Sequence, residues 1–344
     1  MLQKAKIEAF DFVRAISVLM IIIFHFISMI IRNGGGNWGE FNLIAPFGSI
    51  GVSFFIIISG AGLFISSKKW TGCKEFYIKR FKSIYPTFWF VYIFMSCFLL
   101  VFAGRVYVGG DYFKWAITII GFDGYMSWYM PTYYIIGEWF VGFIVLIYLV
   151  FPLIRMSMNA SKSFTFITSI ICAILTFNFN KEISDAFPLF NSNAVWNPII
   201  RLPEFIFGGI VADLIINDKG KLKYLFVFAV IYLSFSILTY DNLDKGVYSI
   251  PSLCALFIVV ISVYDFIGKR VTGDFYNVIL FFSGNSFVAF LIHHKIIGVL
   301  SMYVKINYSD IIAVYIYMMS LLFVVFSISY FLSKPLKYIN KIFN

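Results

Sequence analysis

FDFVRAISVLMIIIFHF, residues 10–26, is an apolar stretch that contains three ionisable side chains, and two of them, Arg14 and His25, lie eleven residues apart. A hydrophobic run of this kind is typical of a membrane-spanning helix. Ionisable side chains are costly at this depth, so both residues are candidates for a functional role. Their separation is close to three helical turns, which puts both on one helix face, roughly 16 Å apart along the axis. Asp11 precedes Arg14 by three residues and shares that face.

The composition of the whole chain is that of an integral membrane protein. Of its 344 residues, 61% are hydrophobic and 13% charged, and the mean hydropathy is +0.88. About ten apolar stretches are long enough to span a bilayer. They cover approximately residues 8–31, 47–66, 84–104, 137–157, 163–179, 199–217, 221–239, 249–267, 277–299 and 309–333. Because only short connectors remain, we expect one all-α domain over residues 1–344, a polytopic membrane helix bundle of about ten transmembrane helices.

The basic residues predict the orientation of this bundle. The net charge is +10, and most Lys and Arg fall in the connectors that lie on one side if both termini are inside. The positive-inside rule therefore predicts cytoplasmic termini and a multi-pass protein in contact with the lipid bilayer. The basic excess reflects topology and anionic lipid, so nucleic acid is not an expected partner. Lys4 and Lys6 suggest a signal peptide, but the polar residues of the first segment and the missing cleavage site argue against one.

This topology sorts the polar residues of the spans by depth. Those near the outer ends are His25, His293, His294, Glu138, Arg201 and Glu204. Those near the inner face are Arg14, Arg80 and Lys82. The residues near the inner face are basic, and those in the outer half of the membrane can take up or release protons. This arrangement suits a ligand with an anionic head and a reactive far end, and coenzyme A has that shape. Each residue also has a structural explanation, as an ion-pair partner, a bond to a buried carbonyl or a positive-inside anchor.

The longest outer connector, residues 105–136, is rich in aromatic side chains. They are Tyr107, Tyr112, Trp115, Tyr125, Trp128, Tyr129, Tyr133 and Tyr134. Its apolar stretch 116–120 is too short to span and is expected to form an interfacial helix. Flat rings can stack on sugars, or they can form the aromatic belt at the lipid headgroups. The four cysteines show no metal-ligand spacing, so we expect free thiols and no bound metal.

Several motifs in order along the chain resemble the integral-membrane acyltransferase family 3, bacterial proteins that move acyl groups onto cell-surface carbohydrates. The most specific is an Arg, ten residues and a His in the first span, with an acid three positions before the Arg; Arg14, His25 and Asp11 fit it. The other matching stretches are GVSFFIIISG (51–60), KRFKSIYP (79–86), GEWFVGFIVLIYLVFP (137–152), RLPEFIFGG (201–209) and NSFVAFLIHH (285–294). The last places the matched histidine at His293.

The chain departs from the family pattern at several positions. The family often has two Arg residues three apart before Ile-Tyr-Pro; Arg80 matches the first, and Ser83 replaces the second. Lys82 is adjacent, but a lysine lacks the bidentate fork of arginine. Phe287 and Phe290 stand where tyrosines are usual, and Ser333 stands where a Glu is common before the last Lys-Pro.

The resemblance implies acyl transfer, most simply of acetyl, from cytoplasmic acyl-coenzyme A to a carbohydrate hydroxyl at the bacterial inner membrane. Arg14, Arg80 and Lys82 would hold donor phosphates, His25 would act as general base, and Asp11 would fix Arg14. Whether His25 first carries the acyl group itself stays open. The residues expected to position the acceptor or to relay protons are Glu138, Arg201, Glu204, His293, Trp128 and Tyr129. Two alternatives stay open: an exporter of a carbohydrate or lipid-linked glycan that does no chemistry, and an inactive accessory subunit.

Overall fold

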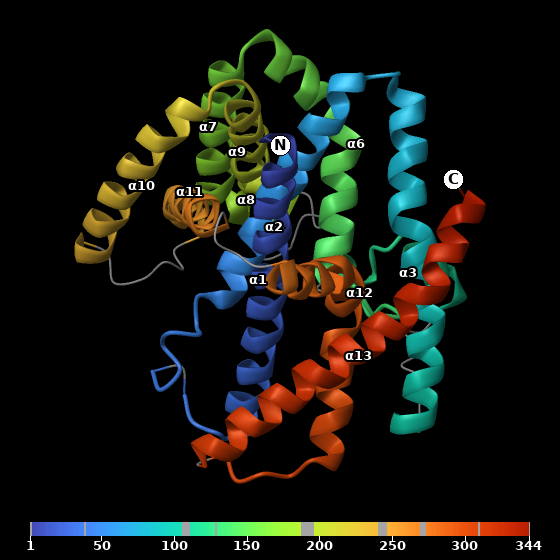
Figure 1. The fold of residues 1–344 in the computed structure, drawn as a ribbon. Coiled ribbons are helices and arrows are strands. Elements are labelled where there is room, and N and C mark those ends of the chain that lie inside the picture. The colour runs from blue at the N-terminus through green and yellow to red at the C-terminus, as the bar shows by residue number, and fades with distance from the viewer. Residues whose placement is uncertain are drawn as a thin grey trace. The chain divides into compact units, whose positions relative to one another are not determined.

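A computed structural model describes residues 2–37, 39–104, 111–127, 129–186, 196–239, 246–268, 273–308 and 310–343. Within these ranges the regular structure is helical, which confirms the predicted all-α class (Figure 1). The helices are α1 (Leu2–Arg32), α2 (Phe47–Ser66), α3 (Cys73–Ala103), α4 (Trp115–Ile119), α5 (Asp123–Met126), α6 (Glu138–Ala160), α7 (Lys162–Asn178), α8 (Asn180–Ala186), α9 (Pro198–Asn217), α10 (Lys219–Thr239), α11 (Ile250–Ile267), α12 (Gly273–Tyr303) and α13 (Ile311–Phe343). Short 3-10 turns, η1 (Ser67–Lys69) among them, join some of these.

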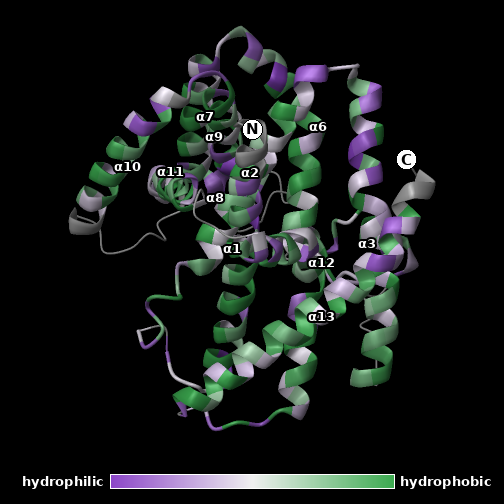
Figure 2. Cartoon of the chain, in the orientation of Figure 1, coloured by the Kyte–Doolittle hydropathy of each residue, from purple (hydrophilic) through white to green (hydrophobic). Residues whose placement is uncertain are grey.

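The long helices are predominantly hydrophobic, as Figure 2 shows. In the described part of the chain, seven are long and apolar enough to cross a membrane. An eighth span results if α7 and α8, which are bent by 74° at their junction, are taken together. The expected count of about ten is therefore not confirmed. Segment 199–217 does form a helix, α9, but its three charged residues, Arg201, Glu204 and Asp213, keep it out of the seven. The orientation of the termini stays a prediction.

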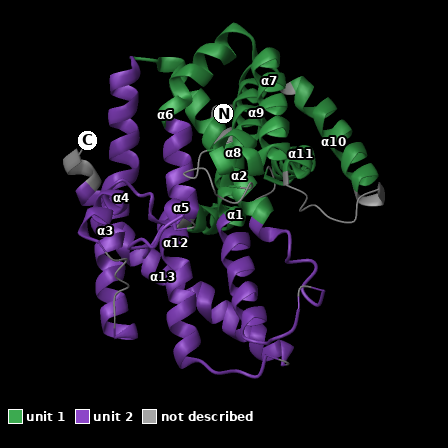
Figure 3. Cartoon of the chain, turned by 180° about the vertical axis from the view of Figure 1, so that it is seen from behind, with its two compact units in different colours: residues 1–17, 49–71, 149–284 green, residues 18–48, 72–148, 285–344 purple. Residues whose placement is uncertain are grey.

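The chain forms two compact units, each assembled from three separate stretches (Figure 3). Unit 1 comprises residues 1–17, 49–71 and 149–284, and unit 2 comprises residues 18–48, 72–148 and 285–344. The predicted single membrane domain over 1–344 stays a prediction, and each unit is described by itself below.

Glycines set the close packing inside unit 1. α7 lies against α9, and α10 against α11 (Figure 1). A Cβ atom on Gly60 of α2 would lie 1.9 Å from the carbonyl oxygen of Phe205, and one on Gly208 of α9 would lie 1.9 Å from that of Ile57. Only glycine fits at such approaches, so the backbones of α2 and α9 touch. This contact brings the polar residues of α9 beside Ser53 of α2.

In unit 2, α3 packs against α13, and large apolar side chains fill the interior. Phe26, Phe88 and Phe143 are almost completely buried. The residue before α6, Gly137, has φ +83°, a left-handed conformation that costs other residues energy. Its N–H reaches the carbonyl oxygen of Leu291 in α12 at 3.4 Å, so the turn before α6 is fixed next to the part of α12 that carries the histidines.

Candidate functional site

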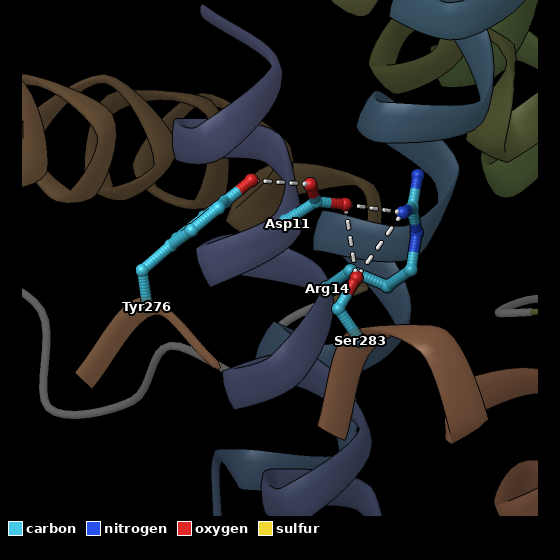
Figure 4. Close-up of polar contacts among 4 residues, drawn as sticks. All are labelled: Asp11, Arg14, Tyr276 and Ser283. Atoms are coloured by element: carbon cyan, nitrogen blue, oxygen red, sulfur yellow. Dashed lines mark hydrogen bonds and ion pairs between the residues drawn. The ribbon is translucent and has the colours of Figure 1, made fainter. Parts of the chain in front are cut away.

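Asp11 is the centre of a polar cluster in unit 1 (Figure 4). Its Oδ1 forms an ion pair with Nη1 of Arg14 at 2.9 Å and accepts a hydrogen bond from the Ser283 hydroxyl at 3.0 Å. Its Oδ2 accepts from the Tyr276 hydroxyl at 3.3 Å. The Arg14 side chain stays 37% exposed, whereas that of Asp11 is 13% exposed. Asp11 therefore holds one edge of the guanidinium and leaves other N–H groups of Arg14 available.

The sequence analysis did not identify Tyr276 and Ser283, the residues of α12 that contact Asp11 and Arg14. Arg14 also donates to the Ser283 hydroxyl at 3.3 Å, so Ser283 contacts both members of the ion pair. Tyr276 and Ser283 are seven residues apart, which puts them on one helix face. That spacing is visible in the sequence, but the partner of this face depends on how α1 and α12 pack, which a single sequence does not reveal.

Arg80 and Lys82 lie on α3 in unit 2. The Arg80 guanidinium lies 5.9 Å from the ring centre of Phe76 and 6.0 Å from that of Tyr148, both within cation–π range. Its Nε atom is buried without a hydrogen-bond partner. Lys82 is half-buried, and Ser83, at the position of the missing second arginine, is exposed. Arg80 is thus held by aromatic faces, and among the described residues no acid pairs with it.

The three histidines come together in unit 2. The ring centre of His25 lies 4.1 Å from that of His294 and 5.2 Å from that of His293, and the latter two lie 4.8 Å apart. His293 is fully buried, and its Nδ1–H donates to the carbonyl oxygen of Phe290 at 2.7 Å. That bond favours the tautomer with a basic Nε2. The motif pointed to His293, but His294 is the closer neighbour of His25.

This cluster also has the composition of a transition-metal site. The ligand nitrogens of His25, His293 and His294 all lie within 4.8 Å of one another. Three imidazoles hold zinc in some enzymes, at Zn–N distances of about 2.0–2.1 Å, so modest ring rotations would be required here. The sequence predicted no bound metal because no ligand spacing was evident. The candidate ligands are His25 and the adjacent pair His293 and His294, which lies far from His25 along the chain.

Arg201 and Glu204 form a buried ion pair in unit 1. Nη1 of Arg201 lies 2.9 Å from Oε1 of Glu204, which also accepts from the Ser53 hydroxyl at 2.8 Å. Their side chains are 4% and 0% exposed, and Oε2 of Glu204 has no hydrogen-bond partner. Loss of one member of such a pair typically costs about 3–5 kcal/mol, because it leaves a buried charge unpaired. The geometry therefore gives both residues a structural role, and their part in acceptor positioning or proton relay stays a prediction.

The remaining predicted residues belong to the connector before α6 or to its boundary. Trp128 and the side chain of Glu138 lie outside the described residues. Tyr129 is 49% exposed, whereas Tyr125 and Tyr133 are buried. Tyr133 stacks on Trp115 with ring centres 4.7 Å apart, at the start of the expected short helix, α4. Part of the aromatic set thus holds the connector in place, and Tyr129 is accessible to a ligand.

Asp123 in the same connector was not singled out from the sequence. It begins α5, is 1% exposed and accepts a hydrogen bond from the Thr118 hydroxyl at 3.0 Å. Its backbone carbonyl accepts from Thr132, and its Oδ2 has no partner. Burial raises the pKa of the Asp123 carboxyl from 3.8 to about 6, although the bond from Thr118 opposes this shift.

Asp123 is expected to make the stability of the protein depend on pH. Because its pKa is higher in the folded state, the folded protein binds the proton more tightly, and the resulting stability is complete below 3.8 and lost as the pH rises through about 6. Thermal unfolding in detergent should therefore give a lower Tm near pH 7 than near pH 5. Asp123→Asn should flatten this difference, and Asp111→Asn, at an exposed acid of the same connector, should not. An unchanged pH dependence in Asp123→Asn would contradict this assignment.

Comparison with known proteins adds one finding. A family model described as an acyltransferase domain matches residues 7–334, which is nearly the whole chain. No curated protein and no solved structure matches it. The matched range contains the Asp11–Arg14 cluster, the three histidines and the buried ion pair.

Proposed function

Because the chain belongs to the integral-membrane acyltransferase family 3, as its motifs predicted, we propose that it transfers an acyl group, most simply acetyl, from cytoplasmic acyl-coenzyme A to a hydroxyl of a cell-surface or exported carbohydrate. Its place would be the bacterial inner membrane, where its apolar helices make it a multi-pass protein. The observation that supports this chemistry best is the histidine cluster, since His25 has two further imidazoles beside it.

In the proposed reaction, His25 takes the proton of the acceptor hydroxyl as that oxygen attacks the carbonyl carbon of the thioester. The C–O bond forms, the C–S bond breaks, and the coenzyme A thiolate leaves with the electron pair and takes up a proton from the imidazolium. His293, with its tautomer fixed by the Phe290 carbonyl, presents a basic nitrogen to the same region. Glu138, Arg201 and Glu204 remain candidates to position the acceptor.

The donor's phosphates are assigned to Arg14, Arg80 and Lys82. The Asp11–Ser283 contacts pre-orient the Arg14 guanidinium, and aromatic faces do the same for Arg80. A guanidinium forms strong, charge-assisted hydrogen bonds to phosphate oxygens, and less side-chain entropy is lost when it is already fixed. This assignment needs no metal or other cofactor besides the acyl donor.

Aromatic residues of the connector are expected to determine transfer to the acceptor and not use of the acyl donor. Replacing Trp128 and Tyr129 together by Ala should lower transfer to glycan, because flat rings offer stacking area at low entropy cost. Hydrolysis of acyl-coenzyme A should persist in the same variant. Asp111→Ala, at an exposed acid of the same connector, is the control for general effects. If both activities stay intact, the rings are interfacial anchors, and if both are lost, the connector has a structural role.

The rival function is export of a carbohydrate without chemistry. An assay with inverted membrane vesicles and acetyl-coenzyme A that is labelled in its acetyl group distinguishes the two functions. The proposal predicts that label appears in the glycan fraction only when the protein is present. Glycan that reaches the vesicle lumen while all label stays on coenzyme A would favour the exporter.

A further inference from the structure

Unit 1 contains a cavity whose lining residues are not among those assigned to the proposed reaction. Its volume is about 280 Å³, and it lies between the ends of α2, α6, α7 and α9. The predicted topology puts all four of these helix ends at the cytoplasmic face. A cavity of this size is at the lower limit of small-molecule sites, so it accommodates a headgroup or a phosphate-bearing fragment.

The charged residues that line the cavity are three cations and one acid: Lys68, Arg155, Lys162 and Asp213. Asp213 is shared, because it forms an ion pair with Lys162 and lies 3.9 Å from Lys68. Its Oδ1 also accepts a hydrogen bond from Asn217 at 2.8 Å. One acid against three cations leaves an excess of positive charge, and no carboxylate of the described residues pairs with Arg155.

Arg155 is held in position by an aromatic ring. Its guanidinium lies 4.5 Å from the ring centre of Trp70, which is a close cation–π contact. The contact fixes the planar fork of N–H donors, and such a fork matches two oxygens of a phosphate. An arginine that only anchors a helix end at the membrane surface needs neither an aromatic platform nor a cavity shared with two lysines.

Part of the cavity lining is apolar. Phe64 and Gly209 line the cavity, and a Cβ atom on Gly209 would lie 2.2 Å from the Phe64 ring. Because Gly209 has no side chain, the Phe64 ring fits against it at this position. A lining with both charged and apolar side chains fits a phosphate that is attached to an organic group better than it fits a free inorganic ion.

We propose that this cavity binds the phosphate of an organic phosphate ester. Two sources share this chemistry: the nucleotide end of the coenzyme A donor and the headgroup of an anionic phospholipid. Arg155 and Lys68 supply positive charge for the phosphate. Asp213 limits the affinity for phosphate because its carboxylate is paired with the Lys162 ammonium. The coenzyme A source rests on the proposed function, whereas the phospholipid source does not. The binding measurement below is also independent of the proposed function.

The test uses variants with opposite expected signs on the full-length purified protein. Arg155→Gln should weaken binding of the phosphate-bearing ligand by about tenfold, the typical loss of a charge-assisted hydrogen bond. Asp213→Asn should tighten it several-fold, because the Lys162 ammonium becomes available. A misfolded variant does not bind more tightly, so the second result does not depend on folding. Lys68→Gln should weaken binding, and Lys69→Gln, at the exposed neighbour that does not line the cavity, is the matched control.

Two probes separate the sources. Binding of coenzyme A is compared with that of pantetheine, which lacks its phosphates, and association of phosphatidylglycerol is compared with that of phosphatidylcholine in nanodiscs. If the variants change coenzyme A binding, the donor occupies the cavity, and if they change phosphatidylglycerol association, the lipid does. The proposal is overturned if Arg155→Gln and Asp213→Asn leave both unchanged, or if Lys69→Gln has the same effect as Lys68→Gln.

Discussion

His25→Ala is expected to lower acyl transfer by roughly 10²–10⁴-fold, the range typical for loss of a general base. The protein should still reach the membrane, because His25 is only half-buried and its neighbours on α1 include fully buried apolar residues such as Phe26. Acetylation of the surface glycan and donor turnover by the purified variant measure the loss. Ser28→Ala is a matched control one turn later on α1, since Ser28 bonds only to the Phe24 carbonyl of its own helix among the contacts described.

A chelator distinguishes the base from a metal ligand at the same position. If His25 acts as a base, activity of the wild-type protein should withstand prolonged treatment with EDTA. If the three histidines hold a metal that the reaction requires, EDTA should abolish activity and zinc should restore it. The second outcome would replace the proposed role of His25, although the family assignment would stand.

Arg14→Ala is expected to raise the KM for acyl-coenzyme A by tenfold or more while kcat changes less. A hydrogen bond to a charged group contributes about 1.5–3 kcal/mol, and the predicted loss is one such contact with phosphate. The fold should tolerate the change, because Asp11 keeps the hydroxyl donors of Ser283 and Tyr276. The variant should use an acyl-pantetheine thioester as well as the wild-type protein does, since that donor lacks the phosphates.

Arg32→Ala, at the exposed end of the same helix, is the control for loss of an arginine. Asp11→Asn should produce a smaller rise in KM, because it frees the guanidinium without removing it. Unchanged affinity for acyl-coenzyme A in Arg14→Ala would leave Arg14 as an ion-pair partner of Asp11 and would remove it from the donor site.

Helical periodicity accounts for contacts within single helices but not for those between helices. The pairing of Asp11 with Arg14 follows from a spacing of three residues, and so does that of Arg201 with Glu204. The contacts of Ser283 and Tyr276 with Asp11, and of His294 with His25, depend on packing between segments more than 250 residues apart. Depth arguments placed the histidines together but could not rank His294 above His293.

The count of membrane helices was the weakest sequence-based prediction. Hydropathy places a segment in a helix, and 199–217 is one, but its buried charges are paired within the protein and do not show whether the helix crosses a bilayer. The bend between α7 and α8 is likewise absent from the hydropathy pattern. Asp123 was missed because one acid in an aromatic connector has no periodic signature, and only its burial marks it.

The most direct test of the central claim is the release of labelled acetyl from acetyl-coenzyme A by the purified protein, measured side by side for the wild type and His25→Ala. The account predicts steady turnover by the wild type, to water or to an added carbohydrate, and a loss of at least about a hundredfold in the variant. No turnover by the wild type, or equal turnover by both proteins, would contradict it.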